Sequence, residues 1–510
     1  MKKTLSIILI IFLIILPGVI LESIPTGVDR SLTLDAKKIN ANEISAWVRN
    51  NGGLHRDPVT MQAGFEWPKG TLKTAIYESG LWLGAKIADS IHVALAYYDY
   101  EFLPGYIDFS TQTPNGKDDP LYRIYKVSPI YPDGGNGFDT WSSWPVSQGA
   151  PWVDVNNNGI YEPPTDYPVM KGDQNMFCAF TDGYPESHTN FSGSTGPLNA
   201  DVHLYVCAKA NPQCADVIYM EYKIINKKNV NWDSLFIGFW SDPDLGNATD
   251  DKTGCDSSLD LGYVYNGSNY DGVYGTNPPA VGYVLYGVSR HNNRMMDAFN
   301  PPRKNAQEPT NYKQVFAGLK GLIPRLDTPY INPLTNQPTK YVYSGDPESS
   351  TGWLDPSPDD VRFFLSSYIG EVVPLDTINF NVAVLIKKGN NNLNSVTAIK
   401  NCVNQVIGIS RLTQNLPSEF ELSQNYPNPF NPVTKIRFSV PLNKGGLRGL
   451  SVKLTIYDIL GREVATPINQ EMKPGRYEVE WDGSNFASGV YFYKLEAGPF
   501  VETKKMVLIK

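Results

Sequence analysis

The chain has 510 residues, of which 41% are hydrophobic and 19% charged, and it carries a formal net charge of −8. Glycine (43 residues), proline (39) and tyrosine (30) are abundant, which is typical of a turn-rich β protein and argues against a helical or disordered chain. The acidic balance argues against a nucleic-acid partner and suits the binding of divalent cations. The length allows roughly three domains.

The N-terminus predicts export. Met1, Lys2 and Lys3 precede an apolar run from Leu5 to Leu21, and a positively charged start before a hydrophobic segment is typical of a signal peptide. We assign the signal peptide to residues 1–23, which would deliver the chain to the periplasm. The run is close to the roughly 20 residues of a membrane span, so an uncleaved anchor stays open.

Residues 24–409 are predicted to form a β-rich cargo region, as one large sandwich-like unit or two packed ones. GLWLGAKI at 80–87 and IHVALAYYDY at 91–100 predict a hairpin. Alternation at 216–226 places Ile218, Met220, Tyr222 and Ile224 on one face of a strand. Further strands are predicted at 234–242, at FAGLKGL (316–322) and at 378–389, with long polar loops at 108–150, 152–200, 241–280 and 290–312.

One helix is predicted near the end of the cargo, at 393–408. Val396, Ile399, Val403 and Ile407 recur at helical spacing, and Ser395 stands where a capping side chain is expected. Residues 410–425 are then a linker to the C-terminal domain.

The cysteines are odd in number, and an oxidising destination permits a disulfide. They are Cys178, Cys207, Cys214, Cys255 and Cys402. Cys207 and Cys214 flank an Asn-Pro turn, so a bridge closing a hairpin is one reading. The other is that these cysteines are small buried strand residues.

One polar loop contains the front half of a calcium-binding pattern. Oxygen-bearing side chains alternate at Asp154, Asn156 and Asn158 and are followed by Gly159, as in the first half of an EF-hand loop. The second half departs from that pattern, so the remaining ligands are predicted to be the carbonyl of Ile160 and the carboxylates of Glu162 and Asp166. The alternative is a turn rich in Asn and Asp that holds no ion.

A second acidic loop has Lys252 as its one nearby basic residue, so a divalent cation is the simplest neutraliser. A solvated acidic loop is the alternative. Its candidate ligands are Asp242, Asp244, Asp250, Asp251 and Asp256. Calcium in a structural role is therefore the predicted cofactor.

No motif for an enzyme emerges: the chain has no HExxH pair, nucleophile elbow, phosphate loop or dinucleotide fingerprint. Paired carboxylates for glycoside hydrolysis stay open, with Glu66, Asp99, Glu101 and Glu221 near aromatic residues. A binding or structural module fits better, and its tryptophans are candidate contacts for a glycan or a surface protein. Trp82 and Trp240 are exceptions, because both lie in strands and are expected in the core. The alternative is a secreted hydrolase acting on polysaccharide.

The C-terminal residues predict a small β-sandwich of short alternating strands. Its motifs are YPNPFNPVT at 426–434, IYDILGREV at 456–464, WDG at 481–483 and SGVYFY at 488–493. In this order they resemble the type A sorting domain of the type IX secretion system, which implies an immunoglobulin-like fold at 426–510. One departure is the insertion NKGGLRGL at 443–450.

The resemblance implies that outer-membrane secretion machinery recognises this domain and delivers the chain to the cell surface or the medium. The residues that carry the resemblance are Pro427, Asn428, Pro429, Phe430, Gly461, Gly475, Trp481, Asp482, Gly483, Ser488, Gly489, Val490, Tyr491 and Lys505. The cargo is itself similar to a group of large secreted proteins of uncharacterised activity that bear the same domain. This second resemblance lies in segments such as WPVSQGAPWVDVNNNGIYEP at 144–163 and implies no chemistry.

Overall fold

The computed structural model describes residues 34–96, 100–135, 137–188, 195–212, 214–289, 295–304, 306–414, 420–441, 450–472, 475–498 and 500–510. The predicted signal peptide at 1–23, Asp99 and all but the last residue of the insertion at 443–450 lie outside these residues. In the described part, no helix has the length and apolar character needed to cross a membrane.

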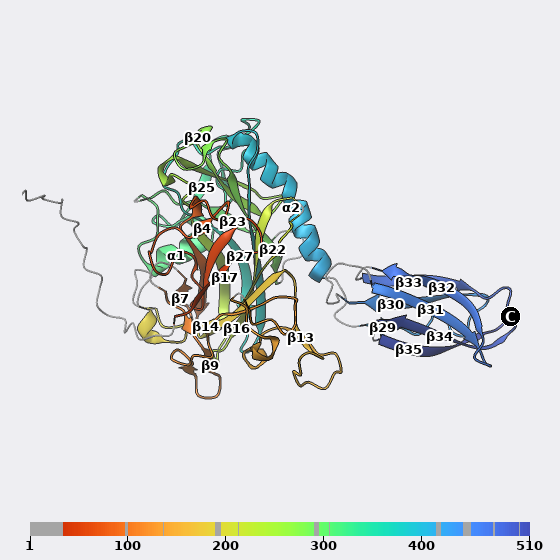
Figure 1. Ribbon diagram of the computed structural model, residues 1–510. Helices are drawn as coiled ribbons and strands as arrows, with labels where there is room; N and C mark the ends of the chain where they lie inside the picture. Colours follow the sequence, from red (N-terminus) through yellow and green to blue (C-terminus); the bar gives the residue numbers. More distant parts are fainter. Residues whose placement is uncertain are drawn as a thin grey trace, which may run out of the picture. The chain divides into compact units, whose positions relative to one another are not determined.

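Residues 34–414 form two large antiparallel sheets, which confirms the mainly β prediction (Figure 1). The first sheet has ten strands. They are β1 (Ala36–Ile39), β2 (Ser45–Arg49), β3 (Leu54–His55), β4 (Phe65–Glu66), β5 (Thr74–Ile76), β6 (Glu78–Ile87), β7 (Ser90–Leu95), β17 (Trp232–Asp242), β23 (Ala298–Asn300) and β27 (Phe363–Val372).

The second sheet has nine strands, and its centre follows the order β14-β15-β16-β28-β22. Its strands are β8 (Leu103–Pro104), β11 (Tyr125–Val127), β14 (Gln174–Thr181), β15 (Ala200–Ala208), β16 (Asp216–Asn226), β18 (Asp251–Asp256), β19 (Leu261–Asn266), β22 (Ala280–Val288) and β28 (Thr377–Lys387).

Short elements fill the connections between these strands. Small ladders are formed by β9 (Tyr106–Asp108) with β10 (Thr113–Asn115), β12 (Trp152–Val153) with β13 (Tyr167–Pro168), β20 (Tyr270–Asp271) with β21 (Gly275–Thr276), and β24 (Leu322–Ile323), β25 (Thr328–Asn332) and β26 (Gln337–Thr339) together. The α-helices are α1 (Tyr312–Leu319) and α2 (Asn392–Gln414), and single 3₁₀ turns lie at Trp141–Ser143, Val146–Gln148, Pro185–Ser187 and Ala248–Asp250.

The two sheets share one hydrophobic core. Leu83 and Phe239 from the first sheet pack in the same buried cluster as Met220 and Val384 from the second. The predicted inward face of β16 is confirmed, because Ile218, Met220, Tyr222 and Ile224 all belong to this cluster. A buried inner face fixes strand register, since a slip of one residue would turn every core side chain outward.

The outer face of each sheet is also covered, at least in part. Helix α1 lies on the first sheet, where the rings of Trp82 and Trp240 stack 5.7 Å apart beneath it, so their predicted burial is confirmed. The outer face of the second sheet is covered on one side by Val396 and Ile399 of α2, and on the other by Trp144, which packs on Phe177 of β14.

Helix α2 confirms the predicted helix at 393–408 but differs in its cap and its end. Asn391 caps it, because its side-chain oxygen accepts from the backbone N–H of Asn394 at 2.8 Å. Ser395 lies one turn inside and bonds the carbonyl of Pro278 at 2.8 Å instead. The helix runs to Gln414, so the start of the predicted linker is helical.

Several other predictions were wrong about the type of element: the predicted loops at 108–150, 241–280 and 290–312 contain β11, β18 and β23, respectively. FAGLKGL at 316–322, predicted as a strand, lies mostly in α1, whose first turn is capped by the side chain of Asn311. The segment 152–200, predicted as a loop, contains β14, a strand of the second sheet. Both faces of β14 are buried, so its sequence shows no alternation of apolar and polar residues.

The disulfide joins Cys214 to Cys402, with Cα atoms 5.6 Å apart, and not to Cys207. Cys207 is a buried free cysteine in β15, where it lies opposite Tyr219 of β16. The bridge fastens α2 to the lead-in of β16.

Residues 420–510 form a separate sandwich of two antiparallel sheets around their own core. One sheet contains β29 (Glu421–Leu422), β30 (Val433–Val440) and β33 (Gly475–Asp482), and the other β31 (Leu450–Asp458), β32 (Glu463–Met472), β34 (Gly489–Ala497) and β35 (Phe500–Leu508).

Replacing Cys214 and Cys402 together by serine should lower the free energy of unfolding by about 2–5 kcal/mol, because the bridge closes a long loop. Thermal unfolding of the exported protein measures this. Wild type in reductant should match the double variant, whereas a melting temperature unchanged by both treatments would contradict the assigned bridge.

Candidate functional site

The predicted calcium loop lies between the paired strands β12 and β13. The carboxylate of Asp154 accepts hydrogen bonds from the N–H groups of Asn158 (3.2 Å) and Gly159 (2.7 Å), and the Asn158 side-chain oxygen accepts from Ile160 N–H at 2.8 Å. The chain therefore curls around the side-chain oxygens of the pattern. Gly159 has φ +73°, a conformation that favours glycine at this turn.

Asp166 joins the two ends of this loop through hydrogen bonds. It is fully buried, and its carboxylate accepts from the N–H groups of Val155 (2.9 Å) and Glu162 (2.8 Å). Glu162 is exposed and accepts from the Asn158 amide at 2.9 Å. The predicted ligands all offer oxygen, as calcium requires, and the side chain of Asn156 is exposed. The carboxylates of Asp154, Glu162 and Asp166 do not converge within 4.8 Å of one another, because the group of three that does so among the described residues lies elsewhere.

The second acidic loop does not gather all its predicted ligands. Asp250 accepts from the Asn266 amide at 2.8 Å, Asp251 is buried and accepts from Leu245 N–H at 2.9 Å, and Asp256 lies 3.7 Å from the ammonium of Lys400. Asp242 and Asp244 remain together at the end of β17.

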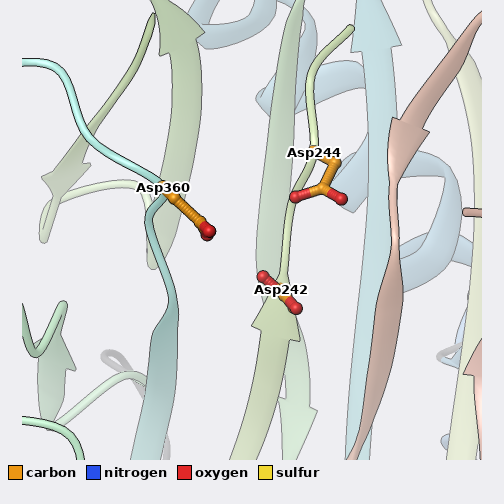
Figure 2. Close-up of side chains that lie close together, drawn as sticks. All are labelled: Asp242, Asp244 and Asp360. Atoms are coloured by element: carbon orange, nitrogen blue, oxygen red, sulfur yellow. The ribbon is translucent and has the colours of Figure 1, made fainter. Parts of the chain in front are cut away.

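A third carboxylate, Asp360, joins Asp242 and Asp244, with ligand oxygens of all three within 4.8 Å of one another. In Figure 2 Asp360 points across at the other two from the segment before β27. Sequence reasoning missed Asp360 because more than a hundred residues separate it from Asp244.

The same fold brings positive charge to this acidic cluster, which we define as Asp242, Asp244 and Asp360. Arg362 lies 3.4 Å from Asp242 and 2.7 Å from Asp360, and Lys304 pairs with Asp360. These cations come from distant segments, so the loop has more positive charge near it than its local sequence indicates. Burial, and next the charge of Asp360, raise the pKa of Asp244 to about 6 against the opposing pull of Arg362 and Lys304.

A cleft of about 600 Å³ opens on the outer face of the second sheet. It lies over the strands β15, β16 and β28, between the area covered by Trp144 and that covered by α2. Its polar lining comes from Lys171, His203, Glu221, Lys223, Ser289, Asn379 and Asn381.

The polar side chains form two rows across the sheet. In one row Tyr205 of β15 lies opposite Glu221 of β16, which lies opposite Asn381 of β28. In the next row His203, Lys223 and Asn379 are paired in the same way. Because residues two apart on a strand share a face, the register places both rows on one surface.

The partners of these side chains differ. Glu221 is held by Lys171 at 2.5 Å and by the hydroxyl of Tyr286 at 3.4 Å. Among the described residues, Lys223 makes no ion pair and the amide of Asn381, 5% exposed, makes no hydrogen bond.

His203 lies at one edge of the cleft, beneath Gly149. A Cβ at Gly149 would come within 2.3 Å of the imidazole ring, so only glycine lets the loop close here. Burial, and next the charges of Lys223 and Lys227, lower the pKa of His203 to about 4, so the ring is neutral at pH 7.

Sequence reasoning found Glu221 but not the rest of this cleft. The signal was present: outward residues of β16 change from Val217 and Tyr219 to Glu221 and Lys223, and asparagines interrupt the otherwise apolar β28 at Asn379 and Asn381.

The other predicted contacts lie elsewhere. Glu101 is buried beside His188, and Glu66 accepts from Leu72 N–H at 2.7 Å, so neither lines the cleft with Glu221. Trp141, Trp144 and Trp232 are buried, so they offer no exposed ring for stacking on a sugar, whereas Trp67, Trp152 and Trp353 are partly buried.

In the C-terminal sandwich, the predicted motifs tie the first segment to the last strand. Phe430 is buried against Trp481, and its N–H donates to the carbonyl of Val507 in β35 at 3.0 Å. The side-chain oxygen of Asn428 accepts from the N–H of the same Val507 at 2.9 Å.

Residues 424–510 match the family model of the secretion system C-terminal sorting domain. This domain is a type IX secretion sorting domain. It marks the chain for secretion to the cell exterior or the outer cell surface. A search of curated proteins returns no match to the chain.

Within the sorting domain, most motif residues serve the fold. Gly461 turns the chain at φ +76°, Gly483 N–H donates to the carbonyl of Pro432 at 2.8 Å, and Asp482 accepts from Ser484 N–H at 2.8 Å. Gly475 begins β33 and Gly489 begins β34, ahead of Val490 and the buried Tyr491.

Other motif residues make hydrogen bonds across the domain. Ser488 accepts from Lys510 N–H at 3.0 Å, and the carbonyl of Lys505 accepts from the Gln424 amide at 2.8 Å. Pro427 also contributes a carbonyl, which accepts from Thr434 at 2.8 Å, whereas no hydrogen bond is assigned to Pro429.

The raised pKa of Asp244 predicts how stability depends on pH without calcium. The carboxyl group of Asp244 binds its proton more tightly in the folded state than in the unfolded chain, where its pKa is near 3.8, so protonation stabilises the fold. This contribution to the free energy of unfolding is complete below pH 4 and is lost as pH rises to about 6. Asp244→Asn should therefore raise the free energy of unfolding at pH 7 by about 1–3 kcal/mol, with little change at pH 4.

Denaturant unfolding in EGTA at both pH values measures this difference. Asp89→Asn, at an exposed turn, is the matched control and should leave the pH dependence unchanged. A less stable Asp244→Asn protein at pH 7 would contradict the assigned burial and repulsion.

Proposed function

We propose that the chain is a passenger of the type IX route whose cargo acts outside the cell as a calcium-stabilised binding module, held at the surface or released there. The sorting domain supplies the export step. The observation that carries the binding role is the cleft on the second sheet, which exposes an ammonium, two amides and a hydroxyl on a rigid floor. Concave sites with a few fixed polar groups are typical of ligand binding.

Binding is favoured over polysaccharide hydrolysis by the placement of carboxylates. Hydrolysis of a glycosidic bond requires two carboxyl groups flanking one sugar. Among the described residues that line the cleft, Glu221 is the single carboxylate, and Lys171 neutralises it at 2.5 Å. The cleft is therefore built to hold polar groups, with a glycan as the class of ligand that suits it.

Calcium is proposed first at the loop formed by Asp154, Asn156, Asn158, Ile160, Glu162 and Asp166. The side-chain oxygens of Asp154 and Asn158 already accept from one turn of backbone, and a bound ion would take the place of these N–H groups. The acidic cluster of Asp242, Asp244 and Asp360 is the second place, although Arg362 and Lys304 already offset its charge. In both places the ion would stabilise the folded cargo and take no part in chemistry.

Deleting residues 416–510 should leave the cargo in the periplasm, because the sorting domain carries the export signal. Fractionation of a host that has the type IX system, followed by immunoblotting, measures this. Phe430→Leu, which keeps an apolar side chain in the domain's core, should still be exported. Recovery of the truncated cargo in the medium at normal yield would refute the assignment.

Chelation of calcium should lower the melting temperature of the exported protein. An ion at a hundred times its dissociation constant stabilises the folded state by about 2.7 kcal/mol, and EGTA removes that contribution. Asp154→Ala should abolish the response to calcium if the ion sits in the first loop, whereas Asp244→Ala should abolish it if the acidic cluster holds the ion. A melting temperature that EGTA does not change would contradict both proposed calcium sites.

A further inference from the structure

We propose that the cleft on the second sheet binds an acidic saccharide, with a sugar carboxylate held by Lys223 and the sugar hydroxyls held by Asn379 and Asn381. This inference rests on the binding role proposed above and names the class of ligand. Three observations carry it: the charge of the cleft, the unused amide at its floor and its size.

The cleft is positive in a negative protein. The chain carries a formal charge of −8, yet among the described residues the charged side chains that line the cleft are Lys171, Lys223 and Glu221, with His203 neutral. Lys171 and Glu221 neutralise each other, which leaves the charge of Lys223. Lys227, which directly follows β16, lies 3.6 Å from Asp201 and is thus paired.

Lys223 is therefore placed to bind an anion, since none of the described residues supplies one to it. It is exposed, and its cross-strand neighbours His203 and Asn379 carry no negative charge. A ligand carboxylate beside this ammonium would form a charge-assisted hydrogen bond, and the neutral neighbours would not compete for it.

Asn381 is placed to recognise hydroxyl groups. Its side chain is nearly buried, it lines the cleft, and among the described residues it has no hydrogen-bond partner. Neither amide atom is fully enclosed, so a ligand in the cleft can bond both of them in place of solvent. An amide offers two donors and one acceptor, a pattern that suits adjacent sugar hydroxyls, and Asn379 repeats it one row away.

The size and the walls of the cleft also favour a sugar. A volume of about 600 Å³ is in the range of small-molecule sites and would hold a short segment of an oligosaccharide. The aromatic residues at its floor, Phe177 and Tyr205, are 1% and 4% exposed, so stacking contributes little and an apolar ligand gains little. Recognition must therefore come from polar groups.

The test is calorimetric titration of the full exported protein with hexuronate trimers of several sugars and linkages. Each trimer is paired with its carboxyl-reduced counterpart, in which every carboxylate is replaced by a hydroxymethyl group. We expect at least one acidic trimer to bind at least tenfold more tightly than its reduced partner, with an affinity that falls as salt rises.

Two variants locate the binding. Lys223→Ala should lower affinity for the acidic trimer at least tenfold and leave the reduced trimer unaffected, whereas Asn381→Ala should weaken both. Lys86→Ala, an exposed strand lysine on the first sheet, is the matched control and should change neither. Melting temperatures establish that each variant is folded.

The outcomes separate this inference from the proposed function. Equal binding of acidic and reduced trimers that Asn381→Ala abolishes would overturn the acidic ligand and leave the cleft as a glycan site. Acidic binding that neither variant affects, or no binding by any trimer, would overturn this inference. Failure of the neutral sugars of a glycan array as well would overturn the glycan role of the cleft itself.

Discussion

The burial of the inner face of the second sheet is the constraint on which the rest of the cargo depends. Ile218, Met220, Tyr222 and Ile224 pack against the first sheet, so β16 cannot slip by one residue without exposing all four. Its outward residues are fixed in consequence. The cleft is thus positioned by the core behind it, since Glu221 and Lys223 alternate with the buried side chains of the same strand.

Features set by local pattern could be predicted from the sequence. The inward face of β16, the hairpin of β6 and β7, the helix α2 and the sorting domain all follow from periodicity or from motifs within short segments. β14 could not be recognised in this way, because burial on both faces removes the alternation that identifies a strand. α1 was read as a strand, because eight residues give too short a pattern to separate the two.

Features that depend on distant segments could not be predicted. Asp360, Lys304 and Arg362 come from segments far along the chain from the end of β17, and they change an acidic loop into a mixed-charge cluster. Cys402 meets Cys214 across 188 residues. Single strands of the candidate site could be predicted, because Asn379 and Asn381 interrupt an otherwise apolar strand. Their position beside Lys223 could not, because it depends on the pairing of β16 with β28.

The sorting domain joins its first and last residues. The segment at Asn428 and Phe430 is held by Val507, three residues from the end of the chain, and Lys510 bonds Ser488 through its backbone. Loss of β35 would therefore leave the opening motif without its hydrogen-bonding partners, even though the motif itself was intact. The two ends of the domain close a single structure, so a lesion at either end removes contacts from the other.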